Sequence, residues 1–335
     1  MKSAAAIAVA GIFLSSFAVL FMLHVSRHAV RSRGRKPYRG ASGEWSIGMY
    51  LGDSLIDLCP GKRAPSPVLT AADVSDVPAE FVADPFMVRE GDTWYMFFEV
   101  MNSSTGQGEI GLAESGNGFA WTYRQIVLAE PFHLSYPYTF KWQDDHYMIP
   151  EAGATQTVRL YKADPFPARW RFIGDLVKGR NFADASVVHY NNVWWLFASN
   201  PECDTLWLFS SDRLTGPYAE HPKSPLIQGD KTRARPGGRI VESGGSLIRF
   251  AQDDYPRYGR QVRAFEITVL TADAYEEREL PGSPVVRWTG LGWNARAMHH
   301  IDPHRIDGDR WIAAVDGFGT VRRRPALLDR RFWKR

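Results

Sequence analysis

A unit of about fifty residues recurs along the body of this chain, and this repeat constrains the fold more than any other feature of the sequence. Each copy opens with a small or polar pair, runs through alternating apolar residues, turns, and enters a strand rich in aromatic side chains. Three clear copies begin at Ala83, Ser135 and Ala183, and weaker copies begin at Arg235 and His299. Such a period is typical of a four-stranded propeller blade, so the sequence predicts five blades.

Turn residues and aromatic content support short antiparallel strands within each copy. Residues 90–92, 191–192 and 307–309 read Glu-Gly-Asp, Asn-Asn and Asp-Gly-Asp, which favour tight reversals. Phe, Trp and Tyr make up 13% of the chain, and these side chains pack well on a pleated sheet. No helix is predicted after residue 36.

The last copy lacks its outer strands, because the sequence turns arginine-rich soon after Asp316. The missing strands are present at the other end of the chain. Residues 45–52 resemble a third strand, and residues 66–73 resemble the end of a fourth strand such as residues 224–230. The N-terminal strands therefore complete the last blade and close the ring, which removes exposed sheet edges. The prediction is an all-β, five-bladed β-propeller over residues 37–318.

An apolar segment precedes the predicted propeller. Residues 4–25 contain no Asp, Glu, Lys or Arg, and a helix of this length spans about 30 Å of hydrocarbon. A cleaved signal peptide is the alternative, but Arg27 stands where a small residue is needed for cleavage. Residues 1–36 are therefore predicted to form one transmembrane anchor with a basic juxtamembrane segment.

Positive charge is concentrated at both ends of the chain. Residues 1–36 contain six Lys or Arg and no acid, and residues 319–335 form a basic tail with seven Lys or Arg and one Asp. The positive-inside rule favours a single-pass membrane protein with its propeller on the cytoplasmic face, and a periplasmic or lumenal face remains open. The body between these segments is acidic, which argues against a nucleic-acid partner.

Strand geometry predicts where functional side chains converge. In an antiparallel blade, the first strand starts and the second strand ends at the same mouth of the central channel. Buried carboxylates at such ends need a partner or a function. An Asp before Pro, however, often only caps a turn, and Asp316-Gly317 is more typical of a turn than of a site. The candidates at the mouth are Asp84, Tyr136, Asp184, Arg235, His299, His300 and Asp302 from first strands, and Glu99, Glu151, Asn200, Asp253 and Asp316 from second strands.

A ring of carboxylates suits chemistry on glycosidic bonds. One acid protonates the departing oxygen, and a second activates water or attacks directly. Aromatic side chains such as Tyr136, Tyr138 and Trp293 are candidates to stack on sugar faces. The chain has no phosphate-binding glycine loop, HExxH, CxxC or nucleophile elbow, and its two cysteines lack metal-ligand spacing. No cofactor and no metal site are predicted.

Several segments resemble known propeller proteins. The ADPF start at residues 83–86, the aromatic units and the acidic mouth are similar to the five-bladed propeller glycosidases, which include arabinanases, β-xylosidases and invertase-like enzymes. Residues 81–88, 147–153, 182–188 and 299–317 resemble more closely the N-terminal propeller domain of glucosamine inositolphosphorylceramide transferases. Bacterial relatives of that domain also occur, some fused to sugar formyltransferase domains.

The resemblance implies roles for individual residues. Asp84 matches the general base of the propeller glycosidases, and Asp184 matches the aspartate that tunes pKa values. Their general acid is a Glu that begins a later first strand, where this chain has Arg235. Either Glu151 or Glu99 supplies the acid from another blade, or hydrolysis is lost.

We therefore expect a membrane-anchored, glycoside hydrolase-like protein that acts on a glycan or glycolipid. Asp84, Glu151 and Asp184 are its predicted catalytic residues. The predicted substrate-binding residues are Glu99, Tyr136, Arg235, His299, His300 and Asp302. The alternatives are a non-catalytic glycan-binding or scaffolding propeller that assists a glycosyltransferase or formyltransferase partner, and a protein-interaction propeller.

Overall fold

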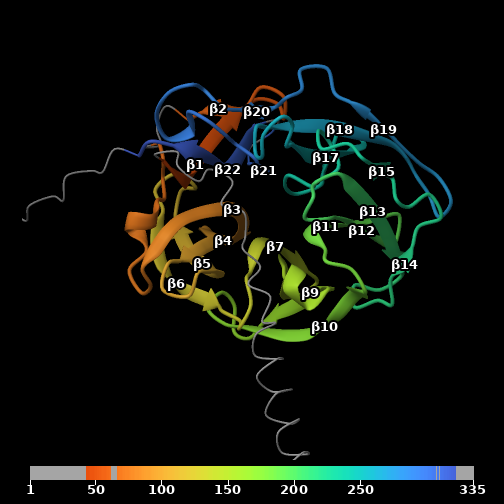
Figure 1. Cartoon of the computed structure of the whole chain (residues 1–335), viewed down its shortest axis with the longest axis horizontal. Helices are drawn as coiled ribbons and strands as arrows, with labels where there is room; N and C mark the ends of the chain where they lie inside the picture. The colour runs from red at the N-terminus through yellow and green to blue at the C-terminus, as the bar shows by residue number, and fades with distance from the viewer. Residues whose placement is uncertain (1–42, 62–65, 307, 309, 322–335) are drawn as a thin grey trace, which may run out of the picture. The chain divides into compact units, whose positions relative to one another are not determined.

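The computed structural model describes residues 43–61, 66–306, 308 and 310–321. Five antiparallel sheets follow one another in a ring, as predicted (Figure 1). Four of the sheets use consecutive segments of the chain, ordered from the innermost strand outward. They are β3 (Ala79–Glu90), β4 (Thr93–Asn102), β5 (Gln107–Ser115) and β6 (Thr122–Leu128) in blade one; β7 (Ser135–Trp142), β8 (Asp145–Glu151), β9 (Thr157–Ala163) and β10 (Trp170–Lys178) in blade two; β11 (Ala183–Tyr190), β12 (Val193–Ser199), β13 (Thr205–Ser211), β14 (Ala219–Glu220) and β15 (Ile227–Gln228) in blade three; and β16 (Val241–Ser243), β17 (Ser246–Asp253), β18 (Gln261–Leu270), β19 (Tyr275–Glu279) and β20 (Val286–Arg287) in blade four.

The fifth blade joins the two ends of the propeller. Its strands are, from the inside outward, β21 (Ile301–Arg305), β22 (Trp311–Gly319), β1 (Glu44–Gly52) and β2 (Cys59–Pro60). β1 pairs with β22 along its whole length, from Glu44 opposite Gly319 to Gly52 opposite Trp311. This confirms that N-terminal strands close the last blade.

The outer edge of β1 differs from the sequence prediction. β2 covers only its second half, and the predicted fourth strand at residues 66–73 contributes a single bridge from Leu69 to Ile47. The remainder of that segment forms a 3-10 turn, η1 (Ala71–Asp73). Thr70 and Asp73 stabilise this turn. The Thr70 hydroxyl accepts a hydrogen bond from the Ala72 N–H, and the Asp73 carboxylate accepts one from the Thr70 N–H.

Helical structure is minimal in the described part of the chain. Besides η1, it comprises only the short turns η2 (Gly153–Thr155) and η3 (Gly292–Asn294). Among these described residues, no helix is long and apolar enough to cross a membrane. The predicted anchor at residues 1–36 and residues 322–335 of the predicted basic tail lie outside the described residues.

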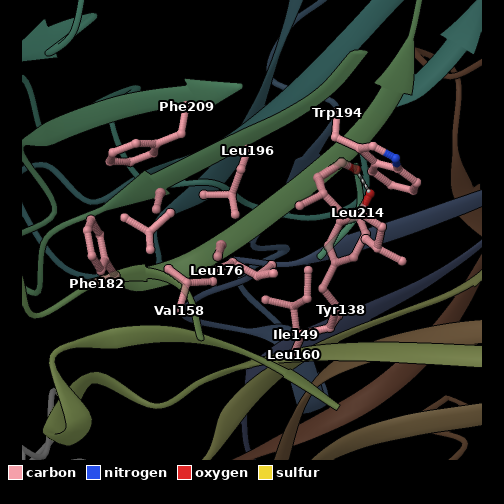
Figure 2. Packing of buried hydrophobic residues seen from close by; sticks show 14 of the residues in the cluster. Tyr138, Ile149, Val158, Leu160, Leu176, Phe182, Trp194, Leu196, Phe209 and Leu214 are labelled. Atoms are coloured by element: carbon pink, nitrogen blue, oxygen red, sulfur yellow. Dashed lines mark hydrogen bonds between the residues drawn. The ribbon is translucent and has the colours of Figure 1, made fainter. Parts of the chain in front are cut away.

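Apolar side chains between neighbouring sheets hold the blades together. Figure 2 shows the cluster between blades two and three, where Ile149 and Val158 of one sheet pack with Leu196 and Phe209 of the next. Burying one such side chain contributes about 1.5–3 kcal/mol. The cluster also contains Tyr138, whose hydroxyl donates a hydrogen bond to the Val187 carbonyl, so Tyr138 is a core residue and the suggestion that it stacks on sugars was wrong.

Gly238 joins the inner strands of three blades. Its N–H donates to the Tyr136 hydroxyl at 2.7 Å, and it forms a parallel bridge to Ile301. Its φ of 145° favours glycine, and an added methyl group would collide with the Ile301 carbonyl oxygen.

We expect Gly238→Ala to lower the free energy of unfolding by roughly 2–5 kcal/mol, because backbone strain and overpacking add. Chemical denaturation measures this loss. Gly174→Ala is the matched control, since a methyl group there meets nothing within 4 Å. Equal free energies of unfolding for the two variants would show that the inner strands can move apart at Gly238 without loss of stability.

Candidate active site

The inner strands of blades one, two and three share an unusual backbone feature at the mouth of the channel. Asp84, Tyr136 and Asp184 have φ values of 54°, 45° and 48°, and each lies in a bulge of its strand pair. The left-handed conformation costs non-glycine residues about 1–3 kcal/mol and is typically kept at functional sites. The bulges of blades one and two lie next to two acids, because Glu99 within β4 pairs with Ala83, and Glu151 at the end of β8 pairs with Ser135.

Arg235 connects the residues of blades two, three and four at the mouth. Its Nε donates to Asp184 Oδ2 at 2.5 Å, its Nη2 donates to Glu151 Oε2 at 3.3 Å, and its Nη1 lies 3.3 Å from Cys203 Sγ. Its guanidinium also lies over the Tyr258 ring, 5.5 Å from the centroid. The Arg235 and Glu151 side chains are 12% and 18% exposed, so both keep a small contact with solvent.

His299 is held between two carboxylates on the other side of the mouth. Its Nδ1 lies 2.7 Å from Asp316 Oδ2, and its Nε2 lies 3.8 Å from Asp84 Oδ1. Trp45 stacks on its ring at 4.1 Å, and Tyr258 contacts it edge-on at 5.3 Å. This packing holds the imidazole between the carboxylates of Asp316 and Asp84.

His300 and Tyr136 are direct neighbours of Asp84. His300 is fully buried, its Nε2 donates to the Pro85 carbonyl at 2.9 Å, and its Nδ1 lies 3.9 Å from Asp84 Oδ1. The Tyr136 N–H donates to Asp84 Oδ2 at 3.3 Å. Both predicted binding residues therefore support Asp84, and Tyr136 is also buried, so it is not free to stack on a sugar.

Burial raises the pKa of three carboxyl groups at the mouth. Burial disfavours the ionised form of Asp84 and raises its pKa. The His299 cation lowers this pKa, whereas the charges of Asp184 and Asp316 raise it further, so that it lies at about 7. The pKa of Glu151 rises well above its usual value through burial and the charge of Asp184. The pKa of Glu99 is likewise raised well above its usual value, first by burial and then by neighbouring carboxylates.

Other groups in the same network are held in their charged forms. Burial would raise the pKa of Asp184, but Arg235 lowers it below its ordinary value. The His299 cation lowers the pKa of Asp316 in the same way against its burial. Burial would lower the pKa of His299, but Asp316 and Asp84 raise it to about 9. Near neutral pH the mouth therefore holds proton donors and ionised carboxylates side by side.

The structure brings most of the predicted residues together and places Asp302 apart. Glu99 Oε1 lies 3.5 Å from His133 Nε2. Glu99 is also close enough to Asp84 for the charges of the two carboxylates to interact. Asp302 instead binds Arg239, with an Nε to Oδ1 distance of 2.6 Å. Among the described contacts, Asp302 has no hydrogen bond or ion pair with Asp84, Glu151 or Asp184.

Sequence reasoning missed or undervalued four residues of the site. Asp316 was expected to be a turn, but it is fully buried and accepts the backbone N–H groups of Asp84 and His299. Gln252 donates to Asp184 Oδ2 at 2.5 Å, where its neighbour Asp253 was expected. Tyr258 and His133 come from loops, and no periodic signal marks them.

Two further candidates serve the fold. Trp293 was suggested to stack on sugars, but it is buried in the core of blades four and five. Asn200 holds a local turn, where its side chain donates to Asp204 and accepts the N–H of Thr205. Neither side chain reaches the mouth network among the described contacts.

A divalent cation has one candidate position in the described residues. Asp84, His299 and Asp316 offer ligand atoms within 4.8 Å of one another. A metal ion there would have to displace the proton that Asp316 and Asp84 stabilise on His299. The short contacts of His299 are ion-pair distances, 2.7 Å from Nδ1 to Asp316 Oδ2 and 3.8 Å from Nε2 to Asp84 Oδ1.

Comparison with solved structures agrees with this fold. An exo-1,5-alpha-L-arabinanase from a bovine ruminal metagenomic library superposes with a TM-score of 0.53 at 12% identity, covering 70% of this chain and 91% of that chain. At such low identity the likeness concerns the five-bladed fold alone, and it confirms the expected similarity to propeller glycosidases.

Comparison of sequences is more specific. The glucosamine inositolphosphorylceramide transferase 1 of Oryza sativa subsp. japonica is 37% identical over 300 residues, and that of Arabidopsis thaliana is 34% identical over 298 residues. Each alignment covers 82% of this chain, and the chain spans about 40% of the length of these curated relatives. A family model for the N-terminal part of glucosamine inositolphosphorylceramide transferase 1 matches residues 38–318. The chain therefore belongs to the family of glucosamine inositolphosphorylceramide transferase 1 N-terminal domains.

Proposed function

We propose that this protein binds the sugar headgroup of a glycolipid at the propeller mouth and cleaves a glycosidic bond there. One observation carries the proposal: Asp84, Glu151 and Asp184 lie in a single buried network around Arg235 that separates their pKa values. Burial raises the pKa of Asp84 to about 7 and that of Glu151 well above its usual value, whereas Arg235 lowers the pKa of Asp184 against its burial. Paired acids with separated pKa values are what acid/base cleavage of a glycoside requires.

Each carboxyl group then has its own role. Glu151 donates its proton to the departing oxygen as the bond from the anomeric carbon to that oxygen breaks. Asp84 accepts a proton from the attacking water, whose hydroxyl ends on the sugar. If the two carboxyl groups are only about 5–5.5 Å apart, Asp84 instead attacks the anomeric carbon, and water, deprotonated by Glu151, then hydrolyses the resulting glycosyl ester. Asp184, held by Arg235 and Gln252, stays negative and favours the protonated form of Glu151.

The names of the relatives suggest the substrate class. A headgroup of glucosamine and inositol phosphate carries hydroxyls and one phosphate. Arg235, whose side chain keeps some exposure at the mouth, would bind such hydroxyls or the anionic phosphate. Residues 4–25 would anchor the chain in the same membrane as this lipid, with the propeller on the cytoplasmic face as the favoured orientation.

A second candidate is supported by the same arginine. Arg235 stands where the propeller glycosidases have their acid, and it binds both Glu151 and Asp184. If these contacts of Arg235 persist when a headgroup binds, the propeller is a non-catalytic module that presents the lipid to a glycosyltransferase.

The test is turnover and binding of a glucosamine inositolphosphorylceramide by the full chain in mixed micelles across pH. We expect kcat/KM to rise with pH through about 7, because Asp84 must lose its proton to act as base. Activity should fall again once Glu151 is deprotonated. A rise near pH 4 instead would mean that an ordinary carboxyl group is the base. Binding without any product would support the non-catalytic module.

A further inference from the structure

An exposed apolar and basic surface borders the mouth between blades four and five. Leu291, Tyr255 and Trp288 are 81%, 63% and 41% exposed, and they are three of the five large hydrophobic side chains exposed in the described part of the chain. Exposed arginines accompany them. We call this surface the basic–aromatic rim and define it as Tyr255, Arg257, Arg287, Trp288, Leu291 and Arg296.

The rim is continuous with the mouth. Arg257 lies over the Trp288 ring, 5.4 Å from its centroid, and so joins the loop after β17 to the segment after β20. The same loop carries Tyr258, which contacts Arg235 and His299 in the mouth. Whatever covers the rim therefore lies beside the entrance to the site.

The charge of the rim has one sign. Residues 255–261 and 286–298 contain four arginines and no Asp or Glu. Arg260 pairs with Asp253 at 3.4 Å, which leaves the three arginines of the rim to face outward. Exposed arginines beside Trp, Tyr and Leu match an anionic, partly apolar surface.

Both ends of the described chain meet the rim at the same edge. Glu44 at the start of β1 pairs with Gly319 at the end of β22, and the Thr320 N–H donates to the Gly292 carbonyl, next to Leu291. Beyond these points the sequence holds the apolar residues 4–25 on one side, and seven Lys or Arg among residues 322–335 on the other. The described chain thus begins and ends beside the rim.

We propose that the basic–aromatic rim docks on a lipid bilayer with anionic headgroups, so that the propeller mouth faces the membrane. Leu291 inserts among the acyl chains, Trp288 and Tyr255 lie at the headgroup level, and the arginines bind lipid phosphates. This docking deepens the proposed function, because a headgroup in that bilayer reaches Arg235 without leaving its membrane. The identity of the ligand that enters the mouth rests on the proposed function. The docking itself does not depend on turnover.

The test places a fluorescent probe on two faces of the full chain in vesicles. In a Cys59→Ser background, Leu291→Cys labels the rim and Asp92→Cys labels the hairpin turn at the opposite end of blade one. Cys59 is exposed and Cys203 is buried, so one site reacts in each variant. The vesicles hold phosphatidylcholine alone or with phosphatidylserine, and lipids carry a quencher at the top of their acyl chains.

We expect quenching of the Leu291 probe in phosphatidylserine vesicles and little quenching of the Asp92 probe. Arg257→Glu with Arg287→Glu should remove most of the quenching at Leu291. Equal quenching at both sites, or none at Leu291, would overturn the proposal. Energy transfer between Leu291 probes of different copies without lipid quenching would assign the rim to self-association and also overturn it. Turnover in detergent is scored separately, so loss of docking and loss of the proposed activity are distinguished.

Discussion

Asp84→Asn should reduce cleavage of the glycolipid by about 10²–10⁴-fold, because a general base is removed. The fold should survive the change. Asn also tolerates the left-handed backbone conformation, and its amide oxygen can still accept the Tyr136 N–H. Initial rates by mass spectrometry measure the loss, with Asp92→Asn as a matched surface control. Activity within a few-fold of the wild type would remove Asp84 from the mechanism.

The same variant should be more stable than the wild type above neutral pH. The pKa of Asp84 is about 7 in the folded protein and about 4 when unfolded, so between these values the folded state binds more protons and stability falls as pH rises. Asparagine has no charge to bury, and we expect a gain on the order of 2 kcal/mol near pH 8 and little gain near pH 4. Denaturation curves at both pH values decide the matter, and a less stable variant at pH 8 would contradict the assignment.

Asp302→Ala should be the most damaging single substitution for stability. The Asp302 carboxylate is fully buried, and it accepts Arg239 Nε and the Met87 N–H, each at 2.6 Å. His304 Nε2 lies 2.8 Å from its second oxygen. Burial would raise the pKa of Asp302, but Arg239 lowers it to about 2, so the pair is ionic throughout the useful pH range. Removing the carboxylate leaves the Arg239 charge buried, at a cost of roughly 3–5 kcal/mol.

Thermal unfolding checks this prediction, and we expect the melting temperature to fall by roughly 10 °C. Asp302→Leu combined with Arg239→Met is the companion variant. Removing both charges should restore much of the lost stability, because no buried charge is left unpaired. An Asp302→Ala protein with normal stability and a raised KM would instead return Asp302 to the substrate site.

The repeat made the architecture predictable from the sequence. Aromatic strands at a constant period fix the blades, and the missing outer strands of the last copy identify residues 45–52 as the closing segment. The rule that first strands start where second strands end also gave the neighbourhood of Asp84, Glu151 and Asp184. These predictions need only strand direction, which the order of turns supplies.

The chemistry of individual residues was less predictable, because it depends on register. A shift by one residue turns a strand side chain to the other face, so Gln252 and not Asp253 reaches Asp184. An Asp-Gly pair normally indicates a turn, yet Asp316 lies inside β22, where the backbone N–H groups of His299 and His300 hold it. Contacts across blades of this kind leave no mark in the local sequence.

The central claim is that the mouth breaks the bond to the anomeric carbon of a bound sugar. Incubation of the full chain and its glycolipid in H₂¹⁸O, followed by mass spectrometry of the products, tests this claim most directly. We predict one ¹⁸O in the released sugar and none in the lipid, and release slowed by about 10²–10⁴-fold in Asp84→Asn. Tight binding with the glycolipid recovered intact, or ¹⁸O found in the lipid, would contradict the account.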